Sequence, residues 1–596
     1  MINKSNIYSF FIDECEASKK RMVELYALDL EERINKRKAI DHVTVDPDYK
    51  ESKLGYNIRK VYAPKNISDF KIGEYLVIHR GSPMLYDSSC NLFDILDDGS
   101  LLLAFDNFGS VGKIDRIVAE NSNQEFILDK NSVDMTRIYE TGFTTIKQEH
   151  LDIVNKIPSP RMAQNRDEII AEIRDTEKNF DIHLTDNQRE AIANAMLSED
   201  YYLIQGPPGT GKSFVIAILL IELLVYKKER VAVSGPNHLA INNVLSKLCS
   251  ICNGLQGVTL KVGQEFNTIG LTYIDQNNEL HSIQNWERIG DISTINNWQN
   301  EDVGIVVGCT PFHMHTKRAG GLKVDTLIID EAGQMNIGLA LMAMSCAKRV
   351  IFVGDHKQMS PIFSSEEHPE ELKRSIFEHL FRDYNSTTLN TSFRMNAPIC
   401  NLISEAFYDG ALKSANPDKR LSINSVSTSS IFNPNTPIVI KDIDHMGTNS
   451  SEEEADFCVS AIKECITQCG VKASDIAVIA PFRAQCALIR KKLRKCKEVL
   501  PNYADIIVDT VDRMQGQEAE VIFISLTAGD TEYISELTNF IFNPNRFNVA
   551  LSRAKNKLII VGNIKAIKAG VNEINCSWLS NLLCSEYITK AELNGE

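Results

Sequence analysis

An eight-residue stretch from Gly206 to Ser213 constrains this chain more than any other feature. It reads GPPGTGKS and lies between an apolar strand, YYLIQ, and an apolar helix, FVIAILL. Glycines let backbone N–H groups curl around phosphate oxygens, and the positive end of the following helix faces them. In such a loop Lys212 reaches the outer phosphates and the Ser213 hydroxyl binds Mg²⁺. We therefore predict a nucleoside triphosphate site, formed by Gly206, Pro207, Pro208, Gly209, Thr210, Gly211, Lys212 and Ser213.

Acidic and amide side chains follow two later strands. Asp330 and Glu331 come directly after VDTLII, and in an open parallel sheet the carboxyl ends of the strands line the ligand crevice. There Asp330 can hold Mg²⁺ while Glu331 orients and deprotonates the attacking water. The acid pair therefore implies hydrolysis as well as binding. The alternative is a surface acid pair at the end of a strand. Gln358 follows the next strand and could hydrogen-bond the terminal phosphate and report its loss.

Composition limits the classes of protein that remain. The 596 residues, 43% of them apolar, suffice for several domains with full cores. A net charge of −15 argues against a uniformly basic protein that coats nucleic acid, but it is compatible with a local positive channel. No secretory signal is visible and the 14 cysteines are scattered, so we expect a cytoplasmic protein, with the nucleus also open. The longest apolar run, 214–225, contains Glu222 and is too short to span a bilayer, so no membrane partner is expected.

Two close pairs resemble halves of metal sites. They are Cys249 with Cys252, and His313 with His315. A structural zinc needs four ligands at suitable spacing, and no matching second pair stands near either. We interpret both pairs as structural.

The order of strands and helices predicts the fold class. Short apolar strands alternate with amphipathic helices from residue 201 to about 354, and a second series of the same kind follows residue 386. Strand then helix, repeated, is typical of a parallel sheet. The prediction is an α/β protein with two tandem parallel sheets that carry helices on both faces. Only the first sheet carries a phosphate loop, so the second must serve the nucleotide in another way.

Ten motifs in a fixed order carry a resemblance to a known family. The motifs are LTDNQREAI, GPPGTGKS, SGPNHLAINNV, VVGCT, DEAGQ, GDHKQMSP, LNTSFRM, IAPFRAQ, VDTVDRMQGQE and NVALSRAK. With these motifs the chain resembles the superfamily 1B helicases, the Upf1-like or DNA2/NAM7-like group, over most of its length. This resemblance implies two RecA-like lobes, with ATP in the cleft between them and single-stranded nucleic acid across their top.

The resemblance also implies roles for single residues. Gln188 would read the edge of the adenine, Phe393 would pack against its ring, and Glu518 would lie near the sugar. Arg394 and Arg553, both in the second lobe, would reach the γ-phosphate across the cleft, Arg553 as an arginine finger supplied in cis. From the local pattern alone, Arg553 could equally be a solvated arginine on a helix. The expected catalytic set is Lys212, Asp330, Glu331, Gln358, Arg394 and Arg553, with Ser213 and Asp330 as the Mg²⁺ ligands.

Nucleic-acid contacts are expected mostly to phosphates and sugars, with low sequence preference. The chain departs from the family pattern here, because Asn237 and His238 follow the proline where relatives usually have Ser and Asn. Gly333 likewise replaces the Ala or Ser that often follows DEA. Single-stranded DNA and RNA both stay open as partners. The expected contact residues are Pro236, Asn237, His238, Thr310 and Thr510.

The N-terminal third suggests accessory domains. Residues 22–40 have helical periodicity, and later glycine-separated alternating runs predict a small β-barrel, as relatives carry before the phosphate loop. The expected domains are a helical stalk (1–45), a β-barrel (46–130), a return linker (131–182), lobe 1 (183–385, with an accessory insertion at 246–302) and lobe 2 (386–596).

Three functions are compatible with these patterns. The first is an ATP-dependent helicase or translocase on single strands, moving 5′ to 3′ as the resemblance implies. The second is a nucleic-acid-stimulated ATPase that clamps or remodels nucleoprotein complexes without separating strands. The third, an oligomeric AAA-type ATPase acting on proteins, takes its arginine from a neighbouring subunit, and the second sheet with its own arginines argues against it. We expect a monomer that uses ATP and Mg²⁺, and protein partners in a larger assembly stay open.

Overall fold

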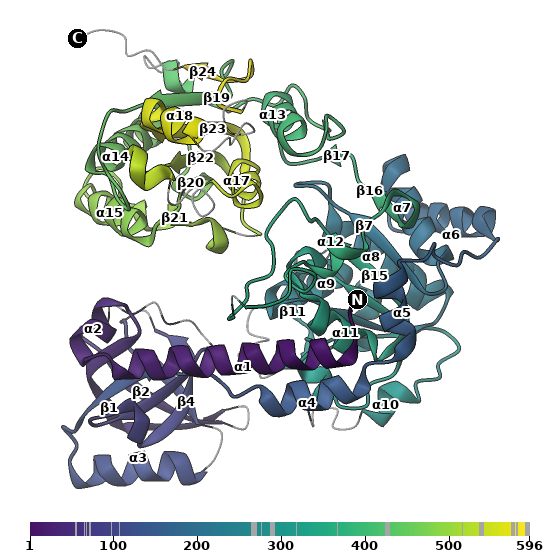
Figure 1. The fold of residues 1–596 in the computed structure, drawn as a ribbon, viewed down its shortest axis with the longest axis horizontal. Helices are drawn as coiled ribbons and strands as arrows, with labels where there is room; N and C mark the ends of the chain where they lie inside the picture. Colours follow the sequence, from purple (N-terminus) through teal and green to yellow (C-terminus); the bar gives the residue numbers. More distant parts are fainter. Residues whose placement is uncertain are drawn as a thin grey trace.

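The computed structural model describes residues 1–53, 56–64, 66, 68, 70, 73–96, 98–105, 108–263, 271–275, 277–285, 292–316, 319–365, 367–423, 430–514, 516–535, 542–573, 579 and 582–590. Two parallel sheets with their helices and a closed N-terminal barrel dominate this part of the chain (Figure 1). The predicted fold class is therefore confirmed, including the helical stalk and the small barrel. No helix among these residues is long and apolar enough to cross a membrane.

The sheet of lobe 1 has eight strands in the order β12-β9-β13-β8-β14-β15-β7-β16, and its paired neighbours run parallel. Its central strands are buried on both faces, which explains why they read as continuous apolar runs. The strands are β7 (Tyr201–Gln205), β8 (Arg230–Ser234), β9 (Thr259–Lys261), β12 (Gln284–Asn285), β13 (Ile305–Gly308), β14 (Val324–Ile329), β15 (Ala347–Gly354) and β16 (Ser386–Thr388). The helices of the lobe are α7 (Asp186–Leu197), α8 (Lys212–Ile221), α9 (His238–Ile251), α10 (Ser293–Asn296), α11 (Ile337–Met344) and α12 (Ile376–Leu380).

Strand order explains why motifs far apart in sequence meet. β7 lies beside β15, and β15 lies beside β14, so the carboxyl ends of these three strands adjoin at one edge of the sheet. The Gly206 N–H donates to the Gly354 carbonyl at 2.9 Å, which joins the start of the phosphate loop to the end of β15. The loop, Asp330 and the segment after Gly354 are therefore neighbours.

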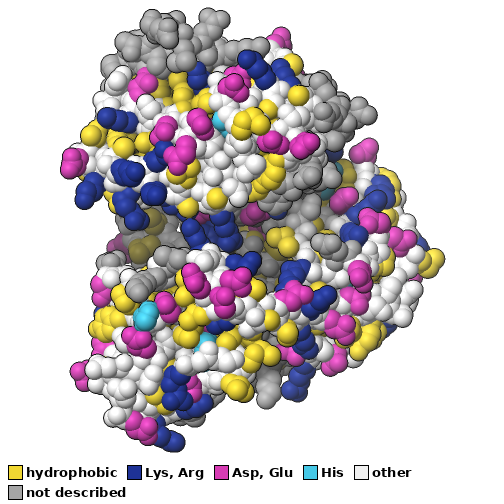
Figure 2. Space-filling view, turned by 60° about the vertical axis from the view of Figure 1, so that its left-hand side comes forward, with side chains coloured by type: hydrophobic (Ala, Val, Ile, Leu, Met, Phe, Trp, Pro, Cys, Tyr) yellow, Lys and Arg dark blue, Asp and Glu magenta, His cyan; other side chains and the backbone are white. Residues whose placement is uncertain are grey.

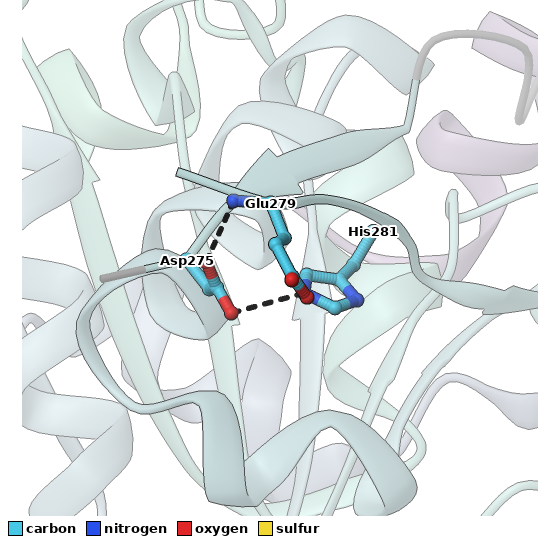
Figure 3. Close-up of side chains that lie close together, drawn as sticks. All are labelled: Asp275, Glu279 and His281. Atoms are coloured by element: carbon cyan, nitrogen blue, oxygen red, sulfur yellow. Dashed lines mark hydrogen bonds and ion pairs between the residues drawn. The ribbon is translucent and has the colours of Figure 1, made fainter. Parts of the chain in front are cut away.

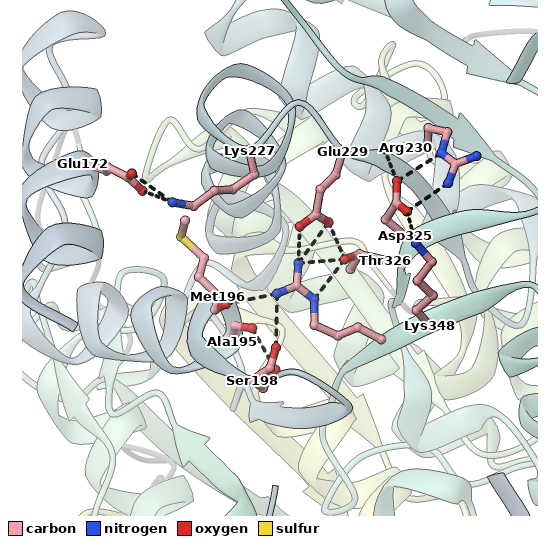
Figure 4. A network of polar contacts seen from close by, with 11 residues as sticks. Glu172, Ala195, Met196, Ser198, Lys227, Glu229, Arg230, Asp325, Thr326 and Lys348 are labelled. Carbon is pink, nitrogen blue, oxygen red and sulfur yellow. Dashed lines mark hydrogen bonds and ion pairs between the residues drawn. The ribbon is translucent and has the colours of Figure 1, made fainter. Parts of the chain in front are cut away.

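The opposite edge of this sheet is held by a polar network (Figure 4). The Arg349 guanidinium donates to the Glu229 carboxylate at 2.8 Å and to the Met196 carbonyl, at the end of α7, at 3.0 Å. Asp325 accepts hydrogen bonds from Arg230 and Lys348, each at 2.9 Å. These groups lie near the amino ends of β8, β14 and β15, so they fix the edge of the sheet that faces away from the phosphate loop.

The sheet of lobe 2 has six strands in the order β21-β20-β22-β23-β19-β24, and its paired neighbours also run parallel. They are β19 (Ile438–Asp442), β20 (Ile476–Ala480), β21 (Ile507–Thr510), β22 (Ala519–Ser525), β23 (Ala554–Gly562) and β24 (Thr589–Lys590). The accompanying helices are α13 (Ala397–Phe407), α14 (Glu452–Thr467), α15 (Arg483–Lys495), α17 (Pro544–Leu551) and α18 (Ile564–Glu573). A two-stranded sheet of β17 (Thr391–Ser392) and β18 (Lys413–Ser414) precedes β19 in sequence.

The N-terminal region forms a stalk and a barrel. Helix α1 (Lys4–Ala27) runs from lobe 1 to the barrel, and its Ile7, Phe10 and Phe11 are buried in the lobe 1 core (Figure 1). The barrel closes in the order β1-β2-β5-β4-β3-β6. Its elements are β1 (Ala39–Lys53), β2 (Tyr56–Tyr62), β3 (Tyr75–His79), β4 (Ser88–Ile95), β5 (Leu101–Phe105), α3 (Phe108–Glu120) and β6 (Glu125–Lys130). The remaining helices are α2 (Leu30–Asn35) before the barrel, and α4 (Thr136–Thr145), α5 (Gln148–Lys156) and α6 (Arg166–Asn179) after it.

Two predicted boundaries differ from the structure. β16 pairs with β7, so the first three residues assigned to lobe 2 belong to the lobe 1 sheet. β9 and β12 lie within 246–302 and extend the same sheet, so the expectation of an accessory insertion is wrong for these strands. The reason is that α9 leads to a further parallel strand rather than leaving the lobe. Parts of this segment, 264–270, 276 and 286–291, lie outside the described residues.

Candidate functional site

A cavity of about 440 Å³ lies between the two sheets and brings most of the predicted nucleotide residues together. Lobe 1 contributes the phosphate loop and the ends of β14 and β15, whereas lobe 2 contributes residues from three separate segments. The lining residues are Pro207, Pro208, Gly209, Thr210, Gly211, Lys212, Ser213, Phe214, Ala240, Asn243, Lys247, Asp330, Glu331, Gln358, Phe393, Arg394, Gly516, Glu518 and Arg553. Of the predicted nucleotide residues, Gly206 and Gln188 do not line the cavity.

The phosphate loop has the backbone that its glycines allow. Gly209 and Gly211 have φ angles of 74° and 80°, a region that other residues rarely adopt. Gly211 is the N-cap of α8, so the positive end of this helix faces the cavity. The Lys212 ammonium donates to the Gly206 carbonyl at 2.8 Å. The loop therefore presents a cation and a helix N-terminus to one space, which suits a polyphosphate.

Lobe 2 packs directly on this loop. The Phe393 N–H donates to the Gly209 carbonyl at 2.8 Å, and the Ser392 hydroxyl donates to the Pro208 carbonyl at 3.0 Å. A Cβ on Gly209 would lie 2.6 Å from the Cβ of Arg394, so this glycine also permits the close approach. The segment that carries Phe393 and Arg394 is thus positioned by the loop itself.

Asp330 and Glu331 stand together at the end of β14. Burial raises the pKa of Asp330, the neighbouring Glu331 carboxylate adds to this rise, and Lys212 opposes it. A buried carboxyl beside a second acid suits a divalent cation, so Asp330 and the Ser213 hydroxyl fit the predicted Mg²⁺ site. Bound there, Mg²⁺ would neutralise charge on the phosphates. Glu331 has a φ of 52°, an uncommon conformation for a residue other than glycine and one that occurs often at active sites.

Gln358 is held by an aspartate that the sequence reasoning missed. Its Nε2 donates to the Asp355 carboxylate at 2.8 Å, and its side chain lines the cavity. A signal for Asp355 was present, because it directly follows β15 at the same sheet edge. Gly333 packs here too: a Cβ on it would lie 2.6 Å from the Asp355 carbonyl oxygen, which accounts for glycine at this position.

Arg394 and Glu518 form an ion pair at the wall of the cavity. The Arg394 Nε donates to Glu518 Oε2 at 2.6 Å, and Lys555 pairs with the other oxygen at 3.0 Å. Burial raises the pKa of Glu518, but Arg394 and Lys555 outweigh it and the net shift is downward. Glu518 therefore holds Arg394 in place, and the predicted contact of Glu518 with a sugar stays a prediction.

Arg553 is buried, so the alternative of a solvated arginine is wrong. Its side chain is 3% exposed, its Nε donates to the Val549 carbonyl at 3.1 Å, and its Nη1 donates to the Gln517 carbonyl at 3.2 Å. Burial, together with the nearby Arg394, lowers the pKa of Arg553 to about 9, while the negative charge of Glu331 opposes this shift. An arginine of lobe 2 thus lies within the electrostatic reach of an acid of lobe 1.

The predicted adenine contacts differ in exposure. Phe393 is 46% exposed and lines the cavity, so its ring is open to a planar partner. The Gln188 amide is engaged within lobe 1: its Nε2 donates to the Thr210 carbonyl and its Oε1 accepts from the Thr185 N–H, each at 3.1 Å. Gln188 therefore supports the loop in this conformation, and its contact with the base stays a prediction.

The predicted nucleic-acid residues lie in three separate parts of the chain, and two of them are buried. Asn237 is exposed but caps α9, since its side-chain oxygen accepts from the Ala240 N–H at 3.0 Å, and Pro236 is half-buried. Thr310 and Thr510 are 5% and 8% exposed, and the Thr310 hydroxyl is hydrogen-bonded to His313 Nδ1 at 2.7 Å. None of the five residues lines the nucleotide cavity. Their strand contacts stay predictions.

His238 has a partner that its sequence context did not indicate. The Lys261 ammonium, which is fully buried at the end of β9, donates to His238 Nδ1 at 3.0 Å. Burial and the charge of Lys261 lower the pKa of His238 to about 3, so the imidazole is neutral at physiological pH. The histidine that departs from the family pattern at this position therefore has a hydrogen-bond partner, Lys261, from β9.

Outside the cleft, one group in the described part of the chain has the residue types of a metal site (Figure 3). Asp275, Glu279 and His281 lie on the hairpin of β10 (Thr272–Ile274) and β11 (Leu280–Ser282). Asp275 accepts from the Glu279 N–H at 2.8 Å and contacts His281 Nε2 at 3.1 Å. The backbone hydrogen bond is the main cause of a lowered Asp275 pKa, so this carboxylate stabilises the turn.

Comparisons with known proteins agree with the cleft. A phosphate loop on one parallel sheet, facing arginines from a second sheet, is typical of two-lobed P-loop nucleoside triphosphatases. Residues 183–297 and 301–366 match one family model described as an AAA domain, and residues 372–565 match another of the same description. The chain belongs to the DNA2/NAM7-like family of superfamily 1 helicases.

Relatives share only part of their length with this chain. The DNA replication ATP-dependent helicase/nuclease dna2 of Schizosaccharomyces pombe is 27% identical over 417 residues, which are 65% of this chain and 28% of that protein. The DNA polymerase alpha-associated DNA helicase A of the same organism is 26% identical over 453 residues, 66% of this chain and 65% of that protein. The chain spans 38% of the Xenopus laevis DNA2 protein. A crystal structure of Arterivirus nonstructural protein 10 (helicase) has a TM-score of 0.39 at 12% identity, covering 88% of this chain and 80% of that one.

Proposed function

We propose that this chain is an ATP-dependent translocase and helicase that moves 5′ to 3′ along single-stranded nucleic acid. One observation carries the proposal: Arg553 of lobe 2 and Glu331 of lobe 1 line the same cavity as the phosphate loop. A triphosphate there would contact cations from both lobes, so its hydrolysis would change the attraction between them.

Each residue has a defined task in this cycle. Lys212, Arg394 and Arg553 bind the phosphate oxygens, and Glu331 accepts a proton from the attacking water. Gln358 contacts the terminal phosphate and loses that contact after release. Because both arginines belong to the same chain as the loop, no second subunit is needed and a monomer suffices.

A basic hollow supports nucleic acid as the partner. Figure 2 shows a hollow between the upper and lower parts of the molecule, with Lys and Arg side chains gathered along it. This gathering exists although the net charge of the chain is −15. Phosphates of a strand would be attracted to such a surface with little dependence on sequence.

The first experiment measures ATP hydrolysis by the purified chain alone, with single-stranded DNA and with single-stranded RNA. We expect at least one polymer to stimulate turnover. Absence of stimulation by both would contradict the proposal and also the second candidate, a nucleic-acid-stimulated ATPase that clamps nucleoprotein complexes.

The second experiment separates these two candidates. Partial duplexes with a 5′ or a 3′ single-stranded tail are offered in DNA and RNA versions with ATP. Unwinding from the 5′ tail supports the proposed function and polarity, unwinding only from the 3′ tail reverses the polarity, and stimulated hydrolysis without unwinding favours the clamp.

A further inference from the structure

Three side chains of lobe 2 reach one short segment of lobe 1, residues 355–360. This segment contains Gln358, whose side chain lines the nucleotide cavity. The contacts run from Tyr408 OH to Asp355 Oδ2 at 2.6 Å, from Asn548 Nδ2 to the Lys357 carbonyl at 2.7 Å and from Asn545 Nδ2 to the His356 carbonyl at 3.1 Å. The segment is therefore held by both lobes.

The Asp355 carboxylate is the centre of these contacts. It is 3% exposed, and a carboxylate has about four acceptor positions that burial leaves unsatisfied unless protein donors fill them. Its donors are Gln205 Nε2 at 3.1 Å, the Lys357 N–H at 3.1 Å, Gln358 Nε2 at 2.8 Å and Tyr408 OH at 2.6 Å. The first three belong to lobe 1, and Tyr408 belongs to lobe 2.

Tyr408 also contacts the helix that precedes Arg553. Asn548, on α17, donates through Nδ2 to Tyr408 OH at 2.8 Å. Arg553 follows α17 by two residues, and its Nε donates back to the Val549 carbonyl of that helix at 3.1 Å. A continuous hydrogen-bonded path thus runs from the Gln358 amide to the helix that positions Arg553.

The chemistry of this path requires the tyrosine hydroxyl. Tyr408 is 7% exposed, and burial and Asp355 raise its pKa well above the ordinary value, so the hydroxyl keeps its proton. The hydroxyl donates to Asp355 and accepts from Asn548, and a phenylalanine can do neither. Tyr408 itself is not among the residues that line the cavity.

We infer that Tyr408 is a positioning residue that links Gln358 of lobe 1 to α17 and Arg553 of lobe 2, so that both groups engage the γ-phosphate together. This inference rests on the proposed function. Through this link, loss of the phosphate contact at Gln358 reaches the arginine helix without any direct contact between the two side chains.

The test is Tyr408→Phe, which removes only the hydroxyl. With saturating single-stranded polymer, we expect kcat for ATP hydrolysis to fall about tenfold or more, since hydrogen bonds to charged groups are worth about that much. KM for ATP should stay within about twofold, because the hydroxyl does not touch the nucleotide. The double variant Tyr408→Phe, Gln358→Ala should lose little more kcat than the more affected single variant, because both residues act through one path.

The matched control is Tyr587→Phe. Its hydroxyl donates to a carboxylate of the same lobe, Glu405 Oε1 at 2.7 Å, away from the cavity, and we expect unchanged kcat. If Tyr408→Phe lowers only the melting temperature and leaves kcat unchanged, or if its effect and that of Gln358→Ala multiply, the inference is wrong. If Tyr408→Phe does not fold, Asn548→Ala carries the same test with the same expected loss. A wild-type chain that no polymer stimulates would contradict the proposed function, and this inference with it.

Discussion

At the level of single residues, opposite charges lie on both sides of one cavity. Glu331 and Arg553 come from different sheets and line the same cavity, so one ligand can contact both. Hydrolysis and lobe closure can then depend on the same few side chains.

We predict that Glu331→Gln binds ATP but barely hydrolyses it. The amide keeps the shape of the side chain and cannot accept the proton, so turnover should fall by about 10²–10⁴. Binding of a fluorescent ATP analogue and release of phosphate measure the two effects. The control is Glu371→Gln, a change at an exposed acid that pairs with the N-terminal amine. We expect it to leave both ATP binding and ATP hydrolysis unchanged. Turnover at the wild-type rate in Glu331→Gln would exclude this residue as the base.

Arg553→Ala should lower polymer-stimulated kcat by about 10³ or more, the usual effect of losing an arginine finger. Affinity for ATP should change little, because Lys212 and the loop backbone remain. Arg420→Ala is the control, since this exposed arginine of lobe 2 donates to the nearby carbonyls of Pro417 and Lys419. Equal loss in both variants would point to general damage to lobe 2.

At the scale of elements, helix α8 carries a charge in an apolar setting. It continues as a π-helix, Glu222–Tyr226, and Glu222 is fully buried there. Burial raises the pKa of Glu222 and the neighbouring Thr176 hydroxyl opposes this rise by a smaller amount, so that the net pKa is about 7. The folded chain therefore holds a proton that the unfolded chain releases between about pH 4.5 and 7.

The free energy of unfolding should consequently fall as pH rises through this window, and Glu222→Gln should remove that fall. At pH 8 we expect the variant to be more stable by about 2–3 kcal/mol. Denaturant unfolding at pH 5 and pH 8 measures it, with Glu168→Gln, an exposed acid of α6, as the control. If the free energy of unfolding of Glu222→Gln fell between pH 5 and pH 8 as much as that of the wild type, the fall would not arise from Glu222.

Local patterns predicted the elements well and their docking poorly. Asp330, Glu331 and Gln358 could be found because each lies within four residues of the end of an apolar strand, and parallel strands bring their ends to one edge. Tyr408 could not be found, because its partners Asp355 and Asn548 lie 53 and 140 residues away, and only the packing of the two lobes joins them. The contact of Lys261 with His238 could not be predicted either, since β9 was expected to lie in an insertion outside the sheet.

At the scale of the whole molecule, the barrel is attached to the stalk by buried charges. Asp129 of the barrel accepts from Arg33 of α2 at 2.8 Å and is hydrogen-bonded to His79 Nε2 at 2.8 Å, and all three side chains are buried. Asp129→Ala leaves Arg33 buried without this partner, so it should destabilise the barrel by about 3–5 kcal/mol. Calorimetry should show one transition moving to lower temperature while ATP binding at the distant cleft persists. Simultaneous loss of ATP binding would contradict the independence of the two parts.

We propose that a cation of lobe 2 contacts the triphosphate held by lobe 1. The most direct measurement is a crystal structure of the chain with Mg²⁺ and a non-hydrolysable ATP analogue. We predict that a guanidinium nitrogen of Arg553 lies about 3 Å from an oxygen of the γ-phosphate. A closed complex in which Arg553 points away from the nucleotide would contradict the account.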